Sequence, residues 1–283
     1  VAPRAQSVGV DPLSSTDIKL RVLDLFSGIG GFSLGLERTG GFETVAFCEI
    51  EPFPRKVLAK HWPEVPIYDD VRTLTAERLA ADGIAVDVIT GGFPCQAFSN
   101  AARGRNNAAD LWPEMRRIIG EVGPSIVIAE NVKRAPVHRV VEFCRDELGM
   151  PGITRRISAH EVGADHERSR WWAIAYSNAD SEFQSAIDAE VAKLRSIRGS
   201  IWGPQAFRAA VCISDGLPTG LDPAGPYGNA VVPQIPELIG NAILAAITPT
   251  TGATPSAPVN LPAASASQGG EVIDLMNQRG RVA

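Results

Sequence analysis

Short apolar runs alternate with stretches of helical spacing along most of the chain. The apolar runs, which we interpret as buried strands, are residues 20–26, 43–50, 67–68, 86–90, 125–129, 153–157 and 171–176. The stretches with helical spacing are residues 32–38, 54–61, 111–122, 138–148 and 236–247. Strands and helices that alternate in this way predict an α/β fold with a doubly wound, mostly parallel sheet.

The pattern also divides the chain into segments. Residues 1–18 are polar and are expected to form a flexible N-terminal arm, and residues 248–283, rich in Thr, Ala, Pro and Ser at first, are expected to be a disordered tail. The main domain is expected over residues 19–176. Residues 177–220 have a weaker pattern, and residues 221–247 contain a C-terminal motif and a helix that we expect to pack back on the main domain.

The composition is that of a globular protein. Of the 283 residues, 45% are hydrophobic and 21% are charged, which excludes wholesale disorder. A formal net charge of −5 is not typical of a protein that coats nucleic acid, although it leaves room for a local basic cleft. The four cysteines form no C-x-x-C pair, so we expect neither a zinc ribbon nor a disulfide framework. We also expect no transmembrane helix and no secretory signal.

A glycine-rich loop, SGIGG at residues 27–31, lies between the first predicted strand and the first predicted helix. Glycines allow a ligand to approach the backbone closely, and the start of a helix offers unpaired N–H groups. Glu49 closes the second strand, where a carboxylate can accept both hydroxyls of a ribose, and Asp70 closes the third, where it can accept from an adenine amino group. These features predict an adenosine-containing ligand; the alternative is a tight turn beside solvated strand ends.

A cysteine and a glutamate follow two later strands. Cys95 lies in the loop GGFPCQAFS and is a candidate nucleophile, whereas the alternative is a small buried thiol. Glu130 follows the run at 125–129, where partial desolvation would let its carboxyl hold a proton at neutral pH; the alternative is a helix N-cap or an ion-paired strand end. Because parallel strands end at one edge of a sheet, we expect Cys95 and Glu130 to lie close together.

These motifs, taken in order, resemble those of the C5-cytosine DNA methyltransferases, and the resemblance covers nearly all of residues 20–247. The matching segments are DLFSGIGGFSLGL, CEIE, DDV, GGFPCQAFS, DLWPEMRRII, ENV, HERSR and YGNAVVPQ. The resemblance implies a Rossmann-like methyltransferase domain over residues 19–176 with a small target-recognition lobe.

The resemblance also implies which residues bind S-adenosylmethionine and which perform the chemistry. The cofactor residues are Phe26, Ser27, Gly28, Ile29, Gly30, Gly31, Glu49, Ile50, Asp70, Val71, Leu111, Asn229 and Ala230. The catalytic residues are Cys95, Glu130, Arg168 and Arg170. The substrate-binding residues are Phe93, Pro94, Gln96, Ser99, Asn131, Val132, Lys193, Arg195 and Arg198.

The implied reaction is methylation of cytosine at C5 in double-stranded DNA. Cys95 would add to C6 of a flipped-out cytosine and form a covalent adduct, while Glu130 binds the N3 and N4 edge. Arg170 would bind O2, and Arg168 would hold a nearby phosphate or carboxylate. Because they are two residues apart, the arginines are expected on one face of a strand; the alternative is an ordinary charged edge.

The implied target-recognition region, residues 177–220, is much shorter than in typical members of the family. It includes the acid-free stretch 191–214 with Lys193, Arg195 and Arg198, which suits phosphate contacts but is also typical of a solvated basic helix. We expect that the region reads a short site, depends on a partner, or has been truncated.

The expected partner is double-stranded DNA, bound by a monomer in the cytoplasm of a bacterial cell or of a phage-infected host. A restriction–modification or phage methylase is the expected role, with a cognate restriction endonuclease as a candidate partner. The alternatives are an RNA cytosine-5 methyltransferase, a catalytically weak or partner-dependent DNA-binding relic, and a cysteine hydrolase.

Overall fold

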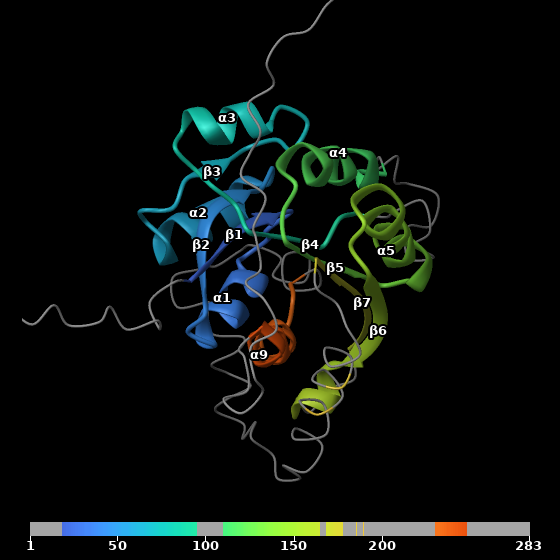
Figure 1. The fold of residues 1–283 in the computed structure, drawn as a ribbon. Helices are drawn as coiled ribbons and strands as arrows, with labels where there is room; N and C mark the ends of the chain where they lie inside the picture. The colour runs from blue at the N-terminus through green and yellow to red at the C-terminus, as the bar shows by residue number, and fades with distance from the viewer. Residues whose placement is uncertain are drawn as a thin grey trace, which may run out of the picture. The chain divides into compact units, whose positions relative to one another are not determined.

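The described part of the chain is built on a seven-stranded sheet (Figure 1). The computed structural model describes residues 19–94, 110–164, 168–177, 185, 189 and 230–247. All of these residues lie in one unit, which the chain forms between Val1 and Thr248.

The strand order is β3-β2-β1-β4-β5-β7-β6. The strands are β1 (Leu20–Leu25), β2 (Phe42–Cys48), β3 (Ile67–Tyr68), β4 (Val88–Gly91), β5 (Ile126–Asn131), β6 (Gly152–Ser158) and β7 (Ser169–Tyr176). The pairs among β1 to β5 are parallel, whereas β7 runs antiparallel to both β5 and β6. This confirms the predicted doubly wound, mostly parallel sheet, and it places the reversal of strand order between β1 and β4, where such folds bind ligands.

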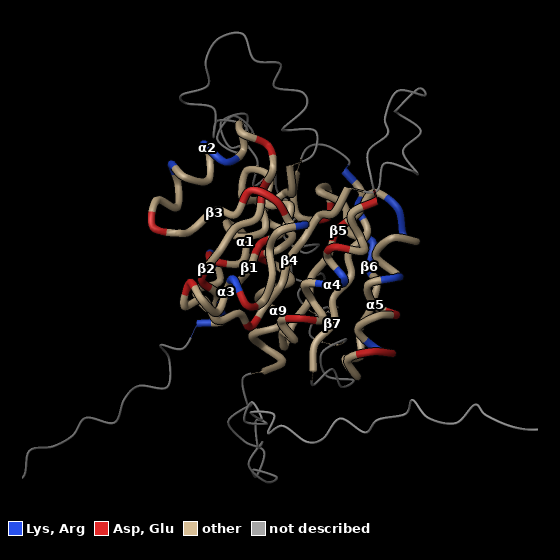
Figure 2. The backbone as a smooth tube through the Cα atoms, turned by 90° about the horizontal axis from the view of Figure 1, so that it is seen from above, with Lys and Arg blue, Asp and Glu red and all other residues tan. Residues whose placement is uncertain are grey.

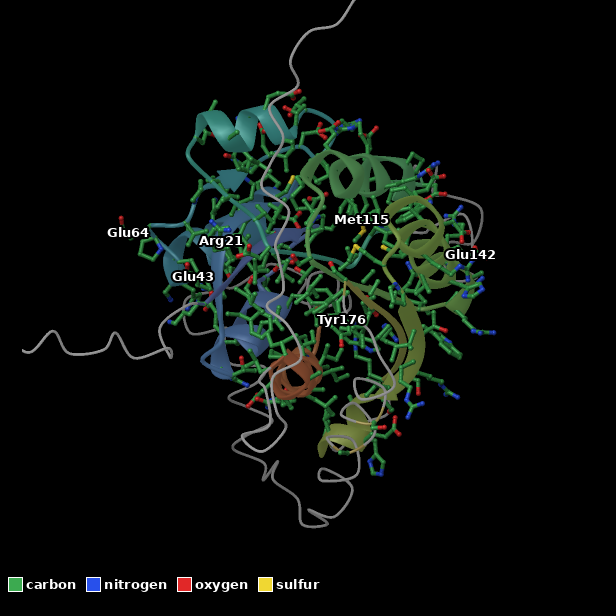
Figure 3. All side chains as sticks on the ribbon, in the orientation of Figure 1. Arg21, Glu43, Glu64, Met115, Glu142 and Tyr176 are labelled. Carbon is green, nitrogen blue, oxygen red and sulfur yellow. The ribbon has the colours of Figure 1, made fainter. Side chains whose placement is uncertain are left out.

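Helices cover both faces of the sheet (Figure 1). They are α1 (Gly31–Arg38), α2 (Pro52–His61), α3 (Ala76–Ala81), α4 (Trp112–Val122), α5 (Arg134–Leu148), the 3-10 helix η3 (Ala159–Val162) and α9 (Gln234–Ile247). One buried cluster joins the sheet to α3, α4 and α5 and includes Met115; the other joins it to α1 and α9 and includes Tyr176. Figure 3 shows both side chains within the fold, while Glu64 and Glu142 lie at its periphery.

Two helices differ from the prediction. Helix α3 was not predicted, because its six residues are too few to show a period; its sequence signal is Thr75, whose side chain accepts from the Arg78 N–H and caps the helix. Helix α5 begins at Arg134, four residues before the predicted start, and includes Pro136. Proline is tolerated there because the N–H groups of a first helical turn have no partner within the helix.

The C-terminal helix α9 packs on α1, although the two are almost 200 residues apart in sequence. Glycines permit this close approach. A Cβ atom at Gly35 would collide with the Pro233 carbonyl oxygen, and one at Gly240 would lie 3.0 Å from the Thr39 methyl group. None of the helices in the described part of the chain is long and apolar enough to cross a membrane.

Several predicted features fall outside the described residues. These are the arm at 1–18, most of the recognition region at 177–220, the tail at 248–283, and the site residues Cys95, Gln96, Ser99, Lys193, Arg195, Arg198 and Asn229.

Candidate active site

The ends of the central strands lie close to one another at one edge of the sheet. Leu25 pairs with Gly91, and Gly91 pairs with Ala129, so β1 and β4 end at one level and β5 runs two residues further, through Glu130 and Asn131. The segments that follow these strands therefore meet at this edge, which we call the rim. They carry the glycine-rich loop, the start of the cysteine-bearing loop, and Glu130.

The turn after β1 is held against the end of β2. Phe26 adopts a left-handed conformation with φ of 52°, which is uncommon for a residue with a side chain. The Cys48 N–H donates to the Ser27 hydroxyl at 3.2 Å, and the Gly28 N–H donates to Glu49 Oε2 at 2.7 Å. The loop is thus fixed by hydrogen bonds before any ligand binds.

The three loop glycines have different surroundings. Gly28 has a φ of 53° and faces open space, so a ligand can approach its backbone. A Cβ atom at Gly30 would lie 2.7 Å from the Trp62 ring, and one at Gly31 would collide with the Val231 carbonyl oxygen. The last two glycines are therefore required by packing, whereas Gly28 is the one that borders open space.

Glu49 is a buried carboxylate at the end of β2. Its side chain accepts from the N–H groups of Gly28 and Glu51, the latter at 2.8 Å. Burial raises its pKa, an effect that these two hydrogen bonds partly oppose. The adjacent Ile50 side chain is 54% exposed, so a buried acceptor and an exposed apolar surface lie side by side at the rim.

At the end of β3 a carboxylate pairs with a cation. Arg72 donates to the Asp70 carboxylate from Nε at 2.9 Å and from Nη2 at 2.6 Å, and these hydrogen bonds lower the pKa of Asp70. Val71 is buried in the core, where its carbonyl oxygen accepts from Arg117 Nη2 at 2.8 Å. Leu111 is partly buried and precedes the first residue of α4.

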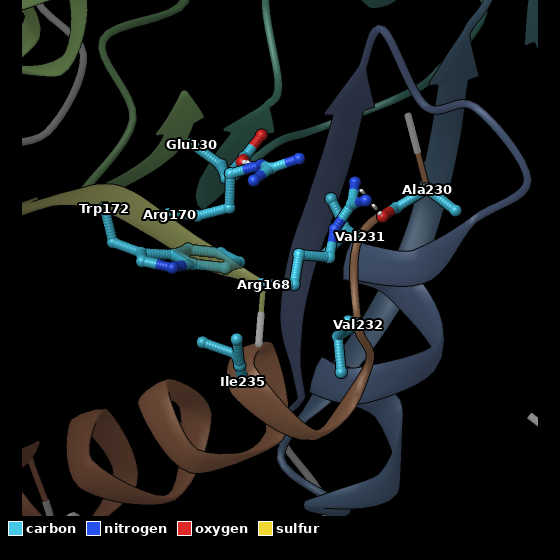
Figure 4. A pocket seen from close by; sticks show the side chains of 8 residues that line it. All are labelled: Glu130, Arg168, Arg170, Trp172, Ala230, Val231, Val232 and Ile235. Atoms are coloured by element: carbon cyan, nitrogen blue, oxygen red, sulfur yellow. Dashed lines mark hydrogen bonds and ion pairs between the residues drawn. The ribbon is translucent and has the colours of Figure 1, made fainter. Parts of the chain in front are cut away.

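Glu130 and Arg170 form an ion pair at the ends of β5 and β7. Arg170 Nε lies 3.0 Å from Glu130 Oε1, and the two side chains are 20% and 14% exposed. Figure 4 shows them pointing toward each other. Burial raises the pKa of Glu130 to about 7, against the opposing effect of the Arg170 and Arg168 charges. Burial at this strand end thus favours the protonated form of the carboxyl.

Arg168 connects the rim to the C-terminal segment. Its Nη2 donates to the Ala230 carbonyl oxygen at 2.9 Å, and burial lowers its pKa. A small pocket lies between these elements (Figure 4). It is lined by Glu130, Arg168, Arg170, Trp172, Ala230, Val231, Val232 and Ile235. Both arginines line this pocket, but only Arg170 lies on a strand, because Arg168 precedes the first residue of β7.

The loop that leads to Cys95 begins beside Glu130. A Cβ atom at Gly92 would lie 3.4 Å from Glu130 Oε2, and the Asn131 side chain donates to the Phe93 carbonyl oxygen at 3.0 Å. The Phe93 side chain is buried against Trp112, with ring centroids 5.6 Å apart, so its side chain lies in the core. Pro94 is partly buried.

Among the described residues of the rim, Val132 has the most exposed large apolar side chain, which is 64% exposed. It follows Asn131 directly and stands beside the strand end that carries Glu130. Among the described residues, no group of three or more His, Cys, Asp or Glu side chains could hold a metal ion.

Sequence reasoning gave no role to Asp24, which the structure places at the centre of the rim. Its carboxylate is fully buried and accepts from Thr90 Oγ1 at 2.7 Å and from Ser33 Oγ at 2.9 Å. It joins β1 to β4 and to α1, and desolvation raises its pKa to about 7. The available signal was an acidic residue within the apolar run LRVLDLF.

Comparisons with known proteins identify relatives of this chain. The family of C-5 cytosine-specific DNA methylases matches residues 20–203. Type II methyltransferase M.HgiBI of Herpetosiphon aurantiacus is 35% identical over 55% of this chain and 37% of its own length. Type II methyltransferase M.HhaI of Haemophilus parahaemolyticus is 32% identical over 56% of this chain and 50% of its own length. The chain thus spans half or less of the length of these two relatives.

A solved structure extends the likeness of fold. The methyltransferase EhMeth of Entamoeba histolytica superposes with a TM-score of 0.54 over 82% of this chain and 99% of its own, at 11% sequence identity. At that identity the likeness supports the fold alone.

Proposed function

Because this chain belongs to the C-5 cytosine-specific DNA methylase family, we propose that it transfers a methyl group from S-adenosylmethionine to C5 of a cytosine in duplex DNA. The observation that carries the proposal is the buried Glu130 carboxyl beside Arg170, next to the start of the cysteine-bearing loop. Cytosine presents an acceptor at N3, a donor at N4 and an acceptor at O2. A carboxyl and a guanidinium held side by side match that edge.

The rim between β1 and β2 fits the methyl donor. Gly28 faces open space, the buried Glu49 carboxylate keeps lone pairs for ribose hydroxyls, and Ile50 offers an exposed apolar surface for an adenine ring. S-adenosylmethionine supplies an activated methyl group on its sulfonium. The other predicted cofactor residues, including Asp70 and Asn229, remain proposals, and in this structure Asp70 binds Arg72.

The proposed chemistry divides between three side chains. The Cys95 thiolate adds to C6 and raises the electron density at C5, which is otherwise a poor nucleophile. Protonated Glu130 donates to N3 as negative charge develops on the ring, and Arg170 binds O2. After methylation, loss of the C5 proton and elimination of Cys95 restore the aromatic ring. The base must first leave the duplex, because C6 cannot be reached within the stack.

We extend this proposal to the biological setting. The relatives are named Type II methyltransferases, and we propose that this chain acts in the same way, as a monomeric modification methylase with a cognate restriction endonuclease, in the cytoplasm of a bacterial or phage-infected cell. Sequence recognition is assigned to residues 177–220, where Lys193, Arg195 and Arg198 would contact phosphates.

The first experiment measures tritium transfer from labelled S-adenosylmethionine to mixed-sequence duplex DNA. The wild-type chain should transfer label, Cys95→Ser should not, and bisulfite sequencing of the product should identify the methylated site. Cys144→Ala is the matched control, because this thiol is buried in α5 and its pKa is raised to about 12, so it cannot supply a thiolate.

A second experiment tests the covalent step. A base can remove the C5 hydrogen as a proton but cannot remove a fluorine from C5, so elimination of Cys95 is blocked. A duplex with 5-fluorocytosine should therefore hold the wild-type chain in a covalent complex that survives denaturing electrophoresis. Cys95→Ser should form no such complex. Label transfer without a Cys95-dependent adduct would overturn the nucleophile assignment, and transfer to RNA but not to DNA would overturn the substrate.

A further inference from the structure

Three exposed cations gather at the rim, near the strand ends that carry Glu130 and Arg170. Strand alternation places Arg156 on the face of the sheet that carries α4 and α5, opposite the face onto which Glu130 and Arg170 point. Lys133 and Arg134 directly follow β5, and Arg156 lies on β6. The strand register places Arg156 level with the end of β5, because Arg156 pairs with Trp171 and Trp171 pairs with Asn131. We call Lys133, Arg134 and Arg156 the rim patch.

The two arginines of the rim patch contact neutral groups within the described part of the chain. The Arg134 guanidinium lies over the Trp171 ring, 5.7 Å from its centroid, and Arg156 Nη2 donates to the Ser169 hydroxyl at 3.0 Å. These contacts orient the guanidinium groups without cancelling their charge. Guanidinium groups held by neutral partners are well suited to bind phosphate.

Charge is segregated along the elements that carry the rim patch. Residues 131–141 and 149–160 contain no Asp or Glu. Helix α5 begins at the rim with Arg134 and carries its acidic residues, Glu142, Asp146 and Glu147, in its second half. Figure 2 shows Lys and Arg positions gathered around β6, whereas Asp and Glu positions gather around β2 and α3.

Helix stability does not account for the cations at the start of α5. The helix has no acidic residue in its first turn and no side-chain cap, and Lys133 and Arg134 stand at its N-terminal end. Positive charges there oppose the helix macrodipole, at a cost of roughly 0.3–1 kcal/mol each. A chain with a net charge of −5 thus concentrates cations where its own fold disfavours them.

We propose that the rim patch is a docking surface for the DNA backbone, which binds phosphates that flank the target cytosine. The inference rests on the proposed function, because that function places the flipped base at Glu130 and Arg170. Neighbouring strands lie about 4.8 Å apart, so Arg156 is about 10 Å from the end of β5. The patch therefore covers a length of one or two nucleotides of a DNA strand.

The test compares two triple variants that each remove three positive charges. One is Lys133→Gln/Arg134→Gln/Arg156→Gln. The matched control is Lys19→Gln/Arg116→Gln/Arg145→Gln, whose positions are exposed and lie away from the rim patch. Fluorescence anisotropy with a labelled 20-base-pair duplex gives the Kd between 50 and 300 mM KCl. Urea unfolding establishes that both variants fold, and the single variant Arg156→Gln serves if the triple variant does not.

The rim-patch variant should lower the slope of log K against log salt by about 2–3, since each lost phosphate contact removes about 0.9. Its Kd for duplex DNA should rise about 10- to 100-fold at 100 mM KCl, its KM for DNA should rise in parallel, and its affinity for S-adenosylmethionine should not change. The control variant should retain most of the wild-type slope. Equal slopes for the two variants would overturn the proposal.

The outcomes separate this proposal from the proposed function. If the wild-type chain methylates DNA and the two variants bind DNA equally, only the rim patch is wrong. If the wild-type chain binds DNA through the rim patch but transfers no methyl group, only the proposed function is wrong. If the rim-patch variant lowered the salt dependence of binding to an RNA duplex but not to a DNA duplex, the proposal that the rim patch binds DNA would be overturned.

Discussion

The two halves of the rim hold their charged groups in opposite ways. In the β1–β2 half, buried carboxylates accept from neutral donors: Asp24 from two hydroxyls and Glu49 from two backbone N–H groups. In the β5–β7 half, Glu130 faces the Arg170 guanidinium and Arg168 lies nearby. The first half therefore holds its acidic groups with neutral donors, whereas the second places two guanidinium groups around one carboxyl. This division suits a cationic methyl donor on one side and an anionic nucleic acid on the other.

The halves also differ in how they are assembled. The β1–β2 half is fixed by short-range hydrogen bonds at the strand ends, which involve Ser27 and Gly28. The pocket in the other half is completed by a segment from far along the chain, because Arg168 binds the Ala230 carbonyl oxygen. The cofactor side is thus organised locally, whereas the base side depends on the docking of the C-terminal segment.

The largest expected effect is that of Glu130→Gln. An amide matches the shape of the carboxyl but supplies no proton as charge develops on the ring, so methyl transfer should fall by about 100-fold or more. Affinity for S-adenosylmethionine should not change. Label transfer and calorimetric titration measure the two quantities, and Glu142→Gln on the exposed side of α5 is the control.

The pH profile gives a second readout for Glu130. Because burial raises its pKa to about 7 and the protonated form is the donor, kcat/KM of the wild-type chain should decrease as the pH rises through 7. That limb should be absent in Glu130→Gln. A flat wild-type profile between pH 6 and 8, or a variant that keeps a tenth of the activity, would contradict this role.

The next largest effect should fall on the other half of the rim. Glu49→Gln removes a charged acceptor, so affinity for S-adenosylmethionine should drop about 10- to 100-fold, the usual range for a hydrogen bond to a charged group. Duplex DNA affinity should be unaffected. Glu51→Gln, at an exposed position two residues from Glu49, is the control and should change neither the affinity for S-adenosylmethionine nor that for DNA. A loss of DNA affinity in Glu49→Gln would show that the two halves are not independent.

The sequence predicted the parts of this site that depend on local pattern. Apolar runs gave the strands, and parallel strands must end together, so Glu130 was expected beside the loop that follows β4. The register of β4 and β5 confirms that placement. The sequence offers an ion-paired strand end only as an alternative for Glu130 and names no partner, because no local pattern shows that β7 runs back along β5.

Features that depend on long-range packing could not be predicted. The packing of Trp62 against Gly30 and of Val231 against Gly31 brings together distant segments, and the role of these glycines toward a cofactor stays a prediction. Asp24 gave no signal beyond one acid in an apolar run, since its hydroxyl partners lie 9 and 66 residues away. Sequence pattern thus identifies which residues reach the rim, while packing decides which of them remain open to a ligand.

A smaller effect should come from Gly31→Ala. The added Cβ would collide with the Val231 carbonyl oxygen and displace the C-terminal segment, at a cost of about 1–3 kcal/mol in the free energy of unfolding. Gly120→Ala is the control, because Gly120 lies within helix α4 and a Cβ atom there would be 3.7 Å from the Phe143 ring, an ordinary contact. This substitution should stabilise the chain by up to about 1 kcal/mol. Urea unfolding measures both, and equal effects would contradict the packing role of Gly31.

A last prediction concerns a pH dependence of stability that comes from Asp24. Its pKa is raised from 3.8 to about 7 in the folded chain, so between about pH 4 and 7 the folded state binds more protons than the unfolded state. The contribution of Asp24 to stability is therefore full at low pH and decreases as the pH rises through this window, by at most about 1.4 kcal/mol per unit.

Asp24→Asn isolates this contribution from those of other carboxyls, because asparagine accepts from Thr90 without titrating. The wild-type free energy of unfolding minus that of Asp24→Asn should decrease between pH 5 and 7 and level off above pH 8. Urea unfolding at each pH gives the difference. A difference that stays flat between pH 5 and 8 would mean that the two hydroxyl donors outweigh burial and hold Asp24 ionised throughout this range. The β1–β2 half of the rim would then carry a fixed negative charge over the same range of pH.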